Sequence, residues 1–285
     1  MLRTLLAIPA YGSPELTDAV LRDLVRDEPR LRDDQHPRDD LHVVVVDNAG
    51  DYVLPGWAGG VELVRTGENL RWIGTANWAF ARGRERGDQV ALLLNNDTRL
   101  SRGFVRGLVG ALDGEAGREV AMAAACYDDF WMHQRAVRVP AEAEAYEPRS
   151  VVRDVPFCDG TAVAFSLAAV AEVGPLDVAT FPAHGYGADV DWALRAREAG
   201  LRCVVTEEAF VHHLRRVTMT RVGRTAEDNR AEILSGLDAR WGDRWRALAG
   251  LGPGAFPPHN TGSGLDWYAD RDWVLGLLDT PDAGR

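Results

Sequence analysis

The sequence predicts an α/β protein built on a mainly parallel sheet, and three observations carry this prediction. The chain has 285 residues, 46% of them hydrophobic, which is enough to bury the core of one large domain or two small ones. Apolar runs of strand length recur, and most are unbroken rather than alternating, which is typical of strands buried on both faces. Helical patterns separate these runs, as expected for parallel strands joined by crossover helices.

The predicted elements follow in order along the chain. The strands of the first half are Thr4–Ile8, His42–Val46, Val61–Val64, Val90–Leu94 and Val120–Ala125. Three helices lie among them, the first capped by Ser13 with Pro14 in its first turn, the second over about Thr75–Arg86, and the third capped by Ser101. The later elements are a strand and a helix within Ala162–Val173, a helix ending near Gly200, a strand over Cys203–Thr206, and an amphipathic helix from Thr225 to about Trp241.

One long segment, Asp128–Asp154, lacks clear periodicity. It is polar and contains Pro140 and Pro148, so we expect it to run over the surface. Long loops of this kind are often functional.

The composition excludes several classes of function. All 32 basic residues are arginine, which excludes Schiff-base chemistry, pyridoxal phosphate and a Walker-A lysine. The net charge of −11 does not attract a polyanion, so we expect no nucleic acid partner. Cys126, Cys158 and Cys203 form no paired motif, which fits a reducing compartment. A reducing compartment predicts a cytoplasmic protein. No stretch approaches the length of a membrane span, so we expect a soluble protein that could also bind at the inner face of the membrane.

Polar residues follow two of the predicted strands directly. Asn95, Asn96 and Asp97 come after one strand, and Asp47 comes after another. In open α/β sheets the ligand crevice lies beyond the carboxyl ends of the strands. A carboxylate there can hold a hard cation on phosphates, or accept hydrogen bonds from a ribose hydroxyl or a base N–H. Each motif alone can also be a simple turn, but two neighbouring ones favour a nucleotide crevice.

A turn over Glu68–Asn77 leads into a helix between these two motifs. Gly74 lets the backbone approach a ligand closely, and the free N–H groups at a helix start favour an anion. The alternative is simply a capped helix.

Asp189 and Asp191 stand at the start of another predicted helix. Acidic side chains are favoured there by the helix dipole without any function. Residues two apart point to nearly opposite sides of a helix, so the two carboxylates are not expected to share one task. Asp191 has Arg195 four residues on, which explains it structurally. Asp189 is therefore the better candidate for a catalytic carboxylate.

His212 and His213 follow a short predicted strand. An imidazole together with Asp97 would complete a divalent-metal site if this part of the chain folds back toward that carboxylate. Alternation along the strand favours His213 over its rival His212. Arg215 just beyond could meet phosphate oxygens.

Taken in order, the motifs resemble the family 2 glycosyltransferases of GT-A fold, in the subgroup that includes many rhamnosyltransferase-like enzymes. The resemblance covers roughly residues 4 to 245. Its motifs are Asp47-Asn48, Glu68-Asn69-Leu70 with Gly74 and Asn77, Asn95-Asn96-Asp97-Thr98, Gly160-Thr161-Ala162, Gly185 to Asp191, and His212-His213. It implies a Rossmann-like sheet in a catalytic domain over 1–224, with a nucleotide-binding half (1–100) and an acceptor-binding half (101–224). A C-terminal helical extension over 225–285 would follow and could mediate a homodimer.

The resemblance also implies an inverting transferase of hexosyltransferase type that uses a nucleotide-diphosphate sugar and Mg²⁺ or Mn²⁺. Asp189 would be the general base, and Asp97 and His213 the metal ligands. The implied donor-binding residues are Pro9, Tyr11, Asp47, Asn69, Gly74, Asn77, Asn95, Asn96 and Arg215. A glycan, lipid-linked or small-molecule acceptor would lie near the aromatic residues Trp131, Tyr186 and Trp192.

The chain departs from the family pattern at two positions. Asn95 replaces the first Asp of the D-x-D motif, and Ala188 stands where the family usually has Glu beside its base. These departures motivate an alternative, a catalytically silent protein that binds nucleotide sugars. A sugar nucleotidyltransferase is a further alternative, although such enzymes usually open with a Gly-rich loop bearing a basic residue, whereas this chain opens with Ile8–Gly12.

Overall fold

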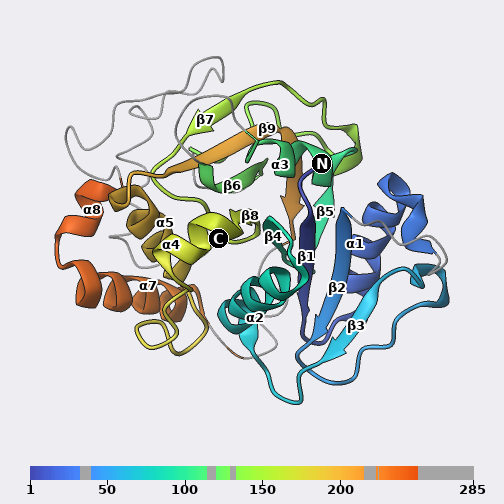
Figure 1. Cartoon of the computed structure of the whole chain (residues 1–285), viewed down its shortest axis with the longest axis horizontal. Coiled ribbons are helices and arrows are strands. Elements are labelled where there is room, and N and C mark those ends of the chain that lie inside the picture. Colours follow the sequence, from blue (N-terminus) through green and yellow to red (C-terminus); the bar gives the residue numbers. More distant parts are fainter. Residues whose placement is uncertain (33–39, 114–119, 129–132, 215–222, 224, 250–285) are drawn as a thin grey trace.

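The structure is a computed structural model that describes the chain except for residues 33–39, 114–119, 129–132, 215–222, 224 and 250–285. The described residues form one nine-stranded sheet in the order β3-β2-β1-β4-β8-β6-β9-β5, with β7 paired to β9 (Figure 1). The strands are β1 Thr4–Ala10, β2 Leu41–Asp47, β3 Glu62–Arg65, β4 Val90–Leu94, β5 Thr98–Leu100, β6 Val120–Tyr127, β7 Val152–Asp154, β8 Ala162–Ser166 and β9 Arg202–His213. Every strand predicted from the sequence is present, and the α/β prediction is confirmed.

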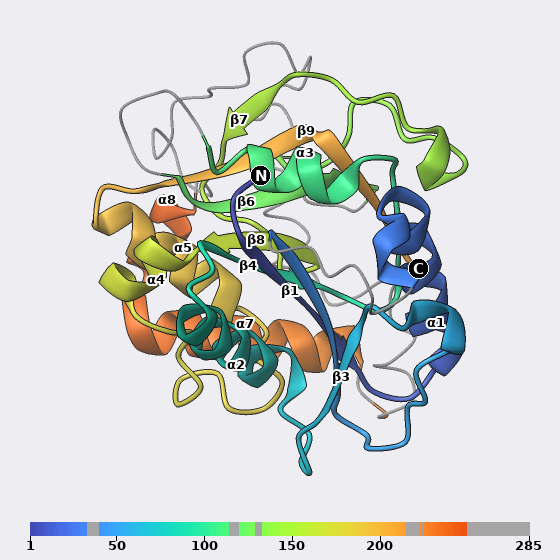
Figure 2. The same cartoon turned by 45° about the vertical axis from the view of Figure 1, so that its right-hand side comes forward.

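Helices cover both faces of this sheet. They are α1 Pro14–Asp27, α2 Arg71–Arg86, α3 Phe104–Gly110, α4 Leu167–Val173, α5 Ala188–Glu198, α7 Ala226–Trp241 and α8 Arg244–Leu248, with short 3-10 turns η1 Pro29–Arg32, η2 Gly56–Ala58 and η3 Ala143–Ala145. In the cartoons, α2, α4, α5 and α7 lie on one side of the sheet and α1 and α3 on the other (Figures 1 and 2). One hydrophobic core includes side chains of the first group of helices, and a second core includes side chains of α1 and α3. Leu5 and Leu6, neighbours in β1, belong to different cores, as unbroken apolar strands predict. None of the described helices combines the length and the apolar character needed to cross a bilayer.

The sheet changes direction in its middle. Strands β3, β2, β1 and β4 are parallel, whereas β8 runs antiparallel to both β4 and β6. Strand β9 is parallel to β6, and the edge strand β5 is antiparallel to β9. The carboxyl ends of β4 and β9 therefore share one edge of the sheet with the starts of β8 and β5. The polar motifs of the sequence lie at this edge.

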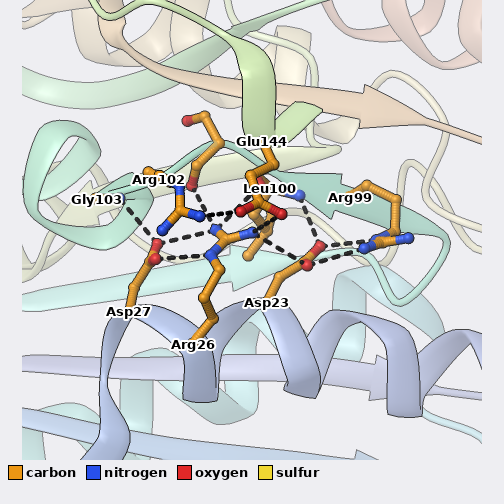
Figure 3. Close-up of polar contacts among 9 residues, drawn as sticks. Asp23, Arg26, Asp27, Arg99, Leu100, Arg102, Gly103 and Glu144 are labelled. Carbon is orange, nitrogen blue, oxygen red and sulfur yellow. Dashed lines mark hydrogen bonds and ion pairs between the residues drawn. The ribbon is translucent and has the colours of Figure 1, made fainter. Parts of the chain in front are cut away.

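Helix α1 holds the short strand β5 in place. Asp23 of α1 is buried and accepts hydrogen bonds from the backbone N–H of Leu100 at 3.0 Å and from Nε of Arg99 at 2.8 Å (Figure 3). On its other side β5 pairs with β9, where Thr98 lies opposite His213. These hydrogen bonds to the Asp23 carboxylate stabilise β5, which has only three residues of strand pairing. A hydrogen bond to a charged group contributes more stability than one between neutral groups.

Of the two predicted helix caps, Ser13 has the predicted N-cap position, with Pro14 in the first turn, and Ser101 does not. Ser13 precedes α1, but its backbone is left-handed, with φ of 51°, and its side chain makes no capping hydrogen bond. Ser101 lies two residues before Gly103, which is the cap position of α3. The Ser101 hydroxyl instead accepts a hydrogen bond from the Phe210 N–H at 3.0 Å, so it joins the start of α3 to β9.

The segment predicted to run over the surface, Asp128–Asp154, is partly buried. Within its described part, Gln134 and Arg153 are both 0% exposed, and the segment contributes β7 to the sheet. Arg153 Nη1 lies 2.7 Å from Oε1 of Glu207, which is also 0% exposed. The buried ion pair explains how a charged residue of this segment enters the core, since a buried charge needs a partner.

Candidate active site

Three segments that are far apart in the sequence meet at one edge of the sheet. The turn after β4 lies against the start of β8, because the Asn95 N–H donates to the Thr161 carbonyl at 2.9 Å. It also lies against the end of β9, because the Leu214 N–H donates to the Asp97 carbonyl at 2.8 Å. Strand β4 pairs with β8 and β5 pairs with β9, so strand pairing fixes both contacts.

Asp97 and His213 form a carboxylate–imidazole pair at this edge. Oδ1 of Asp97 lies 3.5 Å from Nε2 of His213, and the Asp97 side chain is 11% exposed. Oxygen and imidazole nitrogen are both common ligands of divalent cations. No group of three or more His, Cys, Asp or Glu side chains that could hold a metal occurs among the described residues. Two such ligands leave most of a coordination shell open, so a cation held here would need its other ligands from elsewhere, as Mg²⁺ often takes them from substrate phosphates and water.

His212 points away from Asp97. Its Nδ1 lies 2.7 Å from Oδ2 of Asp128, and its Nε2 lies 3.0 Å from the carbonyl of Pro140. Neighbouring residues of a strand face opposite sides, so only one of the two histidines can reach the carboxylate. The structure places His213 there, and His212 anchors the Asp128–Asp154 segment to β9.

Asp189 lies in the first turn of α5, two residues after the N-cap residue Gly187, which has a left-handed φ of 90°. Its Oδ2 accepts the Gly160 N–H at 2.8 Å, and its Oδ1 accepts the Val190 N–H at 2.9 Å. Burial, and secondly the nearby carboxylate of Asp159, raise the pKa of Asp189 to about 7. A carboxylate with this pKa can take up a proton near neutral pH.

Asp191 has the structural role expected from its spacing to Arg195. Its Oδ2 accepts from Nε of Arg195 at 2.9 Å, and its Oδ1 accepts from Nε1 of Trp241 at 2.8 Å. Asp191 is 0% exposed. The two aspartates of α5 are thus separated, with one holding α7 against α5 and the other facing Gly160.

The loop that leads into α5 is held from two sides. On one side, Nη1 of Arg71 in α2 donates to the carbonyl of Pro182 at 2.7 Å. On the other, Oε1 of Glu232 in α7 accepts the N–H groups of His184 at 2.7 Å and Gly185 at 2.8 Å. The first helix of the C-terminal extension therefore contacts the loop that positions Asp189.

Gly160 joins Asp189 to helix α2. Its carbonyl accepts a hydrogen bond from Nε1 of Trp72 at 3.0 Å, while its N–H binds Asp189. A Cβ atom added to Gly160 would lie 2.5 Å from Cζ2 of the Trp72 ring. The close approach of the indole therefore requires glycine at this position.

We expect Gly160→Ala to destabilise the fold by about 1–3 kcal/mol, because the added methyl group overpacks the Trp72 contact. Urea unfolding measures this change. Gly110→Ala is the matched control, since a Cβ at Gly110 in α3 meets no atom within 4 Å. Equal stability of both variants and the wild-type chain would contradict the tight packing at Gly160.

The predicted nucleoside side of the site lies at the ends of β1 and β2. Asp47 is 1% exposed, and its carboxylate accepts the N–H groups of Gly50 at 2.7 Å and Tyr52 at 3.0 Å. These bonds shape the turn after β2. Pro9 is partly buried at the end of β1, and Tyr11 is 37% exposed just beyond it. The roles of these residues in donor binding stay predictions.

Two of the predicted donor-binding amides hold elements together. Asn96 is buried, and its Nδ2 donates to Oγ1 of Thr17 in α1 at 3.1 Å. Asn77 of α2 exchanges two hydrogen bonds with the backbone of Leu176, both of 2.9 Å. Each of these two amides therefore has a structural partner. Asn95, which precedes Asn96 in the turn after β4, is only partly buried.

The first turn of α2 and the residues before it are compact. Asn69 is exposed, and its Oδ1 accepts the Arg71 N–H at 2.8 Å. Arg71 has a left-handed φ of 59°, which is uncommon for a residue other than glycine. Gly74 lies in the first turn of α2, where its N–H donates to the Leu70 carbonyl at 3.1 Å and an added Cβ atom would lie 3.1 Å from Cβ of Leu70.

The aromatic residues predicted near the acceptor differ in position. Trp192 is 0% exposed, donates from Nε1 to the Gly174 carbonyl at 2.8 Å, and packs edge-on against Phe165. It is a core residue and offers no ring face to a ligand, because its position on α5 points it into the core. Tyr186 is partly exposed in the loop before α5. Trp131 and Arg215 lie outside the described residues.

Sequence reasoning missed two side chains of this site. The Thr161 hydroxyl donates to Oδ1 of Asp159 and lies 3.3 Å from Nδ1 of His213. Both residues lie just before β8 in the sequence. This position would have indicated the site only if β8 had been known to run antiparallel to β4, which brings the start of β8 beside the end of β4. A parallel strand would have placed them at the opposite edge.

The sequence was compared with protein families and with curated proteins. No protein-family model matches the chain. Uncharacterized protein Rv1525 of Mycobacterium tuberculosis (strain ATCC 25618 / H37Rv) is 36% identical to it over 215 residues, which are 75% of each chain. Uncharacterized protein Mb1552 of Mycobacterium bovis (strain ATCC BAA-935 / AF2122/97) gives the same values.

Solved structures share its fold. GalNAc-T7 with UDP, GalNAc and Mn²⁺ has a TM-score of 0.57 and 13% identity, and the match covers 95% of this chain and 55% of that one. TarS of S. aureus, residues 1–349 with UDP-GlcNAc, has a TM-score of 0.53 and 12% identity over 87% and 70%. The mannosyltransferase PcManGT of Pyrobaculum calidifontis, with GDP-Man and Mn²⁺, has a TM-score of 0.50 and 18% identity over 97% and 81%. The chain thus has the GT-A glycosyltransferase fold and spans about half the length of GalNAc-T7.

Proposed function

The chain belongs to the family of the mycobacterial protein Rv1525, and from this premise and its GT-A fold we propose that it is an inverting glycosyltransferase. It transfers a hexose-type sugar from a nucleotide diphosphate to an acceptor hydroxyl, as the resemblance to family 2 and its rhamnosyltransferase-like subgroup implies. The acceptor is a glycan, a lipid-linked sugar or a small molecule that binds on the side of Tyr186. Pro9, Tyr11, Asp47 and Asn69 line the nucleoside side, and Arg215 contacts the diphosphate.

The proposal rests on one observation: the candidate base and the candidate metal ligands contact two adjacent residues, Gly160 and Thr161. Gly160 donates its N–H to Asp189, and Thr161 lies beside His213, which faces Asp97. A candidate base and a candidate cation site therefore flank one short segment at the carboxyl edge of the sheet. Ligands bind at this edge in open α/β sheets.

The proposed reaction is a single displacement at the anomeric carbon. An acceptor hydroxyl gives its proton to Asp189 as its oxygen forms the new bond to that carbon. The bond from the carbon to the diphosphate breaks, and the diphosphate leaves with the electron pair. The two N–H groups on Asp189 orient the carboxylate and leave lone pairs for the acceptor hydroxyl. A divalent cation held by Asp97 and His213 would stabilise the negative charge of the departing diphosphate.

The raised pKa of Asp189 predicts how activity changes with pH. The base works only when deprotonated, so kcat/KM should fall about tenfold for each pH unit below about 7 and level off above it. A pH profile of initial rates measures this. A flat profile between pH 5 and 8 would contradict the role of Asp189.

The same ionisation should affect stability in the opposite sense. Folding raises the pKa of Asp189 from 3.8 to about 7, so the folded chain holds this proton more tightly than the unfolded one. The resulting stabilisation is complete below about pH 4 and is lost as pH rises through about 7. The melting temperature of the wild-type chain minus that of Asp189→Asn should therefore be smaller at pH 8 than at pH 5. An equal difference at both pH values would contradict the raised pKa.

A screen of nucleotide sugars tests the proposal. A donor that binds the native chain raises its melting temperature, and we expect this rise to be larger with Mn²⁺. NMR of the transferred sugar should show an inverted anomeric configuration. Binding without transfer or hydrolysis of the donor would favour instead the silent binding protein that Asn95 and Ala188 motivate. Absence of binding across UDP, GDP and dTDP sugars would contradict both.

A further inference from the structure

We infer that Thr161, backed by Asp159, is a positioning residue that orients His213 so that Nε2 faces the cation site beside Asp97. This inference rests on the proposed function. It concerns residues that lie between the candidate base and the candidate metal ligands, and to which the motifs alone gave no role.

The direction of the hydrogen bonds carries the first step. The Thr161 hydroxyl donates its single hydrogen to Oδ1 of Asp159, and a carboxylate can only accept. Toward His213 the hydroxyl therefore has lone pairs to offer. Nδ1 of His213, 3.3 Å away, can complete this contact only as a donor. The proton of the neutral ring is thereby placed on Nδ1, and Nε2 carries the lone pair.

The second step is that the supporting residues are themselves fixed. The Asp159 carboxylate also accepts the backbone N–H of Thr161 at 2.8 Å. The Asp159 N–H donates to Oε1 of Gln134 at 2.9 Å, and Gln134 is 0% exposed and bonded through Nε2 to the Ala125 carbonyl. The hydroxyl thus has a buried anchor that reaches into β6.

The third step concerns what Nε2 faces. With the proton on Nδ1, an unprotonated nitrogen and a carboxylate oxygen stand 3.5 Å apart. A divalent cation between these two atoms would be attracted to both, whereas without a cation a second proton on Nε2 can meet the carboxylate. Histidines that bind metals through one ring nitrogen usually donate the other N–H to an oxygen, which fixes the ring. Thr161 supplies that oxygen here, and its carbonyl also holds the turn of Asp97 through Asn95.

Thr161→Val tests the inference, because it removes the hydroxyl and keeps the shape of the side chain. Mn²⁺ binding is measured by electron paramagnetic resonance and calorimetry on the full chain, with UDP or GDP present. We expect Thr161→Val to weaken Mn²⁺ binding about 10- to 100-fold and Thr161→Ser to restore most of it. Nucleotide binding without the metal should change little.

Thr206→Val is the matched control, since Thr206 is buried like Thr161 but lies in another strand, β9. If Thr161→Val does not fold, Asp159→Asn replaces it. The amide NH₂ of the new side chain donates to the Thr161 hydroxyl, so the hydroxyl hydrogen turns toward Nδ1 of His213. This change should weaken Mn²⁺ binding to a similar extent. Wild-type Mn²⁺ affinity in Thr161→Val, or equal loss in Thr161→Val and Thr161→Ser, would overturn the inference alone. Absence of Mn²⁺ binding in the wild-type chain with every nucleotide would count against the metal site of the proposed function.

Discussion

Replacing Asp189 with asparagine should lower kcat by about 10²- to 10⁴-fold, which is the usual contribution of a general base. The amide retains the shape of the side chain but cannot take up the acceptor proton. Donor affinity should change little, because the base acts on the acceptor hydroxyl in the transition state. Steady-state kinetics with the donor found in the screen, together with calorimetry of donor binding, measure both effects.

Glu198→Gln provides the control for this variant. Glu198 lies at the other end of α5, where it pairs with Arg244 on the surface. The substitution removes a carboxylate from the same helix without touching the candidate site. An exposed ion pair contributes little energy, so kcat should stay within about twofold of the wild-type value. Wild-type turnover in Asp189→Asn would remove this residue from the role of base.

Replacing Asp97 with alanine should abolish the effect of Mn²⁺ on donor binding. The variant loses the only carboxylate proposed for the cation. Loss of a residue that hydrogen-bonds to a metal ligand weakens metal binding by up to about 100-fold, so we expect loss of a ligand itself to lower the metal-dependent donor affinity at least that much. Donor binding with and without Mn²⁺, measured by calorimetry, separates this loss from a general loss of affinity.

Asp88→Ala is the matched control for Asp97→Ala. Both aspartates are buried and flank β4, but Asp88 lies at the opposite end, where it pairs with Arg86 at 3.2 Å. Its removal should cost stability and leave the response to Mn²⁺ intact. Equal metal dependence of Asp97→Ala and the wild-type chain would contradict the assignment of Asp97.

The parts of the fold that follow from local pattern could be predicted from the sequence. Strands such as Val90–Leu94 are buried on both faces, so each contains a run of apolar residues that needs no knowledge of its neighbours. The position of Asp97 at a strand end follows from the same reading. The pairing of Asp191 with Arg195 was also predictable, because helix geometry alone brings residues four apart together.

The remaining features depend on contacts between distant segments. Strand β5 has three residues and no periodic pattern, yet its pairing with β9 brings His213 to Asp97. Ser101 looks like a helix cap, but its hydroxyl is used by Phe210 of another strand. Trp192 could not be assigned to the core or the surface without knowing which face of α5 is covered. In each case the partner lies far along the chain.

The most direct test is a crystal structure of the chain with Mn²⁺ and a nucleotide sugar that stabilises it, with the metal located by its anomalous scattering. We expect the Mn²⁺ signal between Asp97 and His213, and the anomeric carbon on the side that faces Asp189. A nucleotide bound elsewhere, or a metal that contacts neither Asp97 nor His213, would contradict a single site built from these three residues.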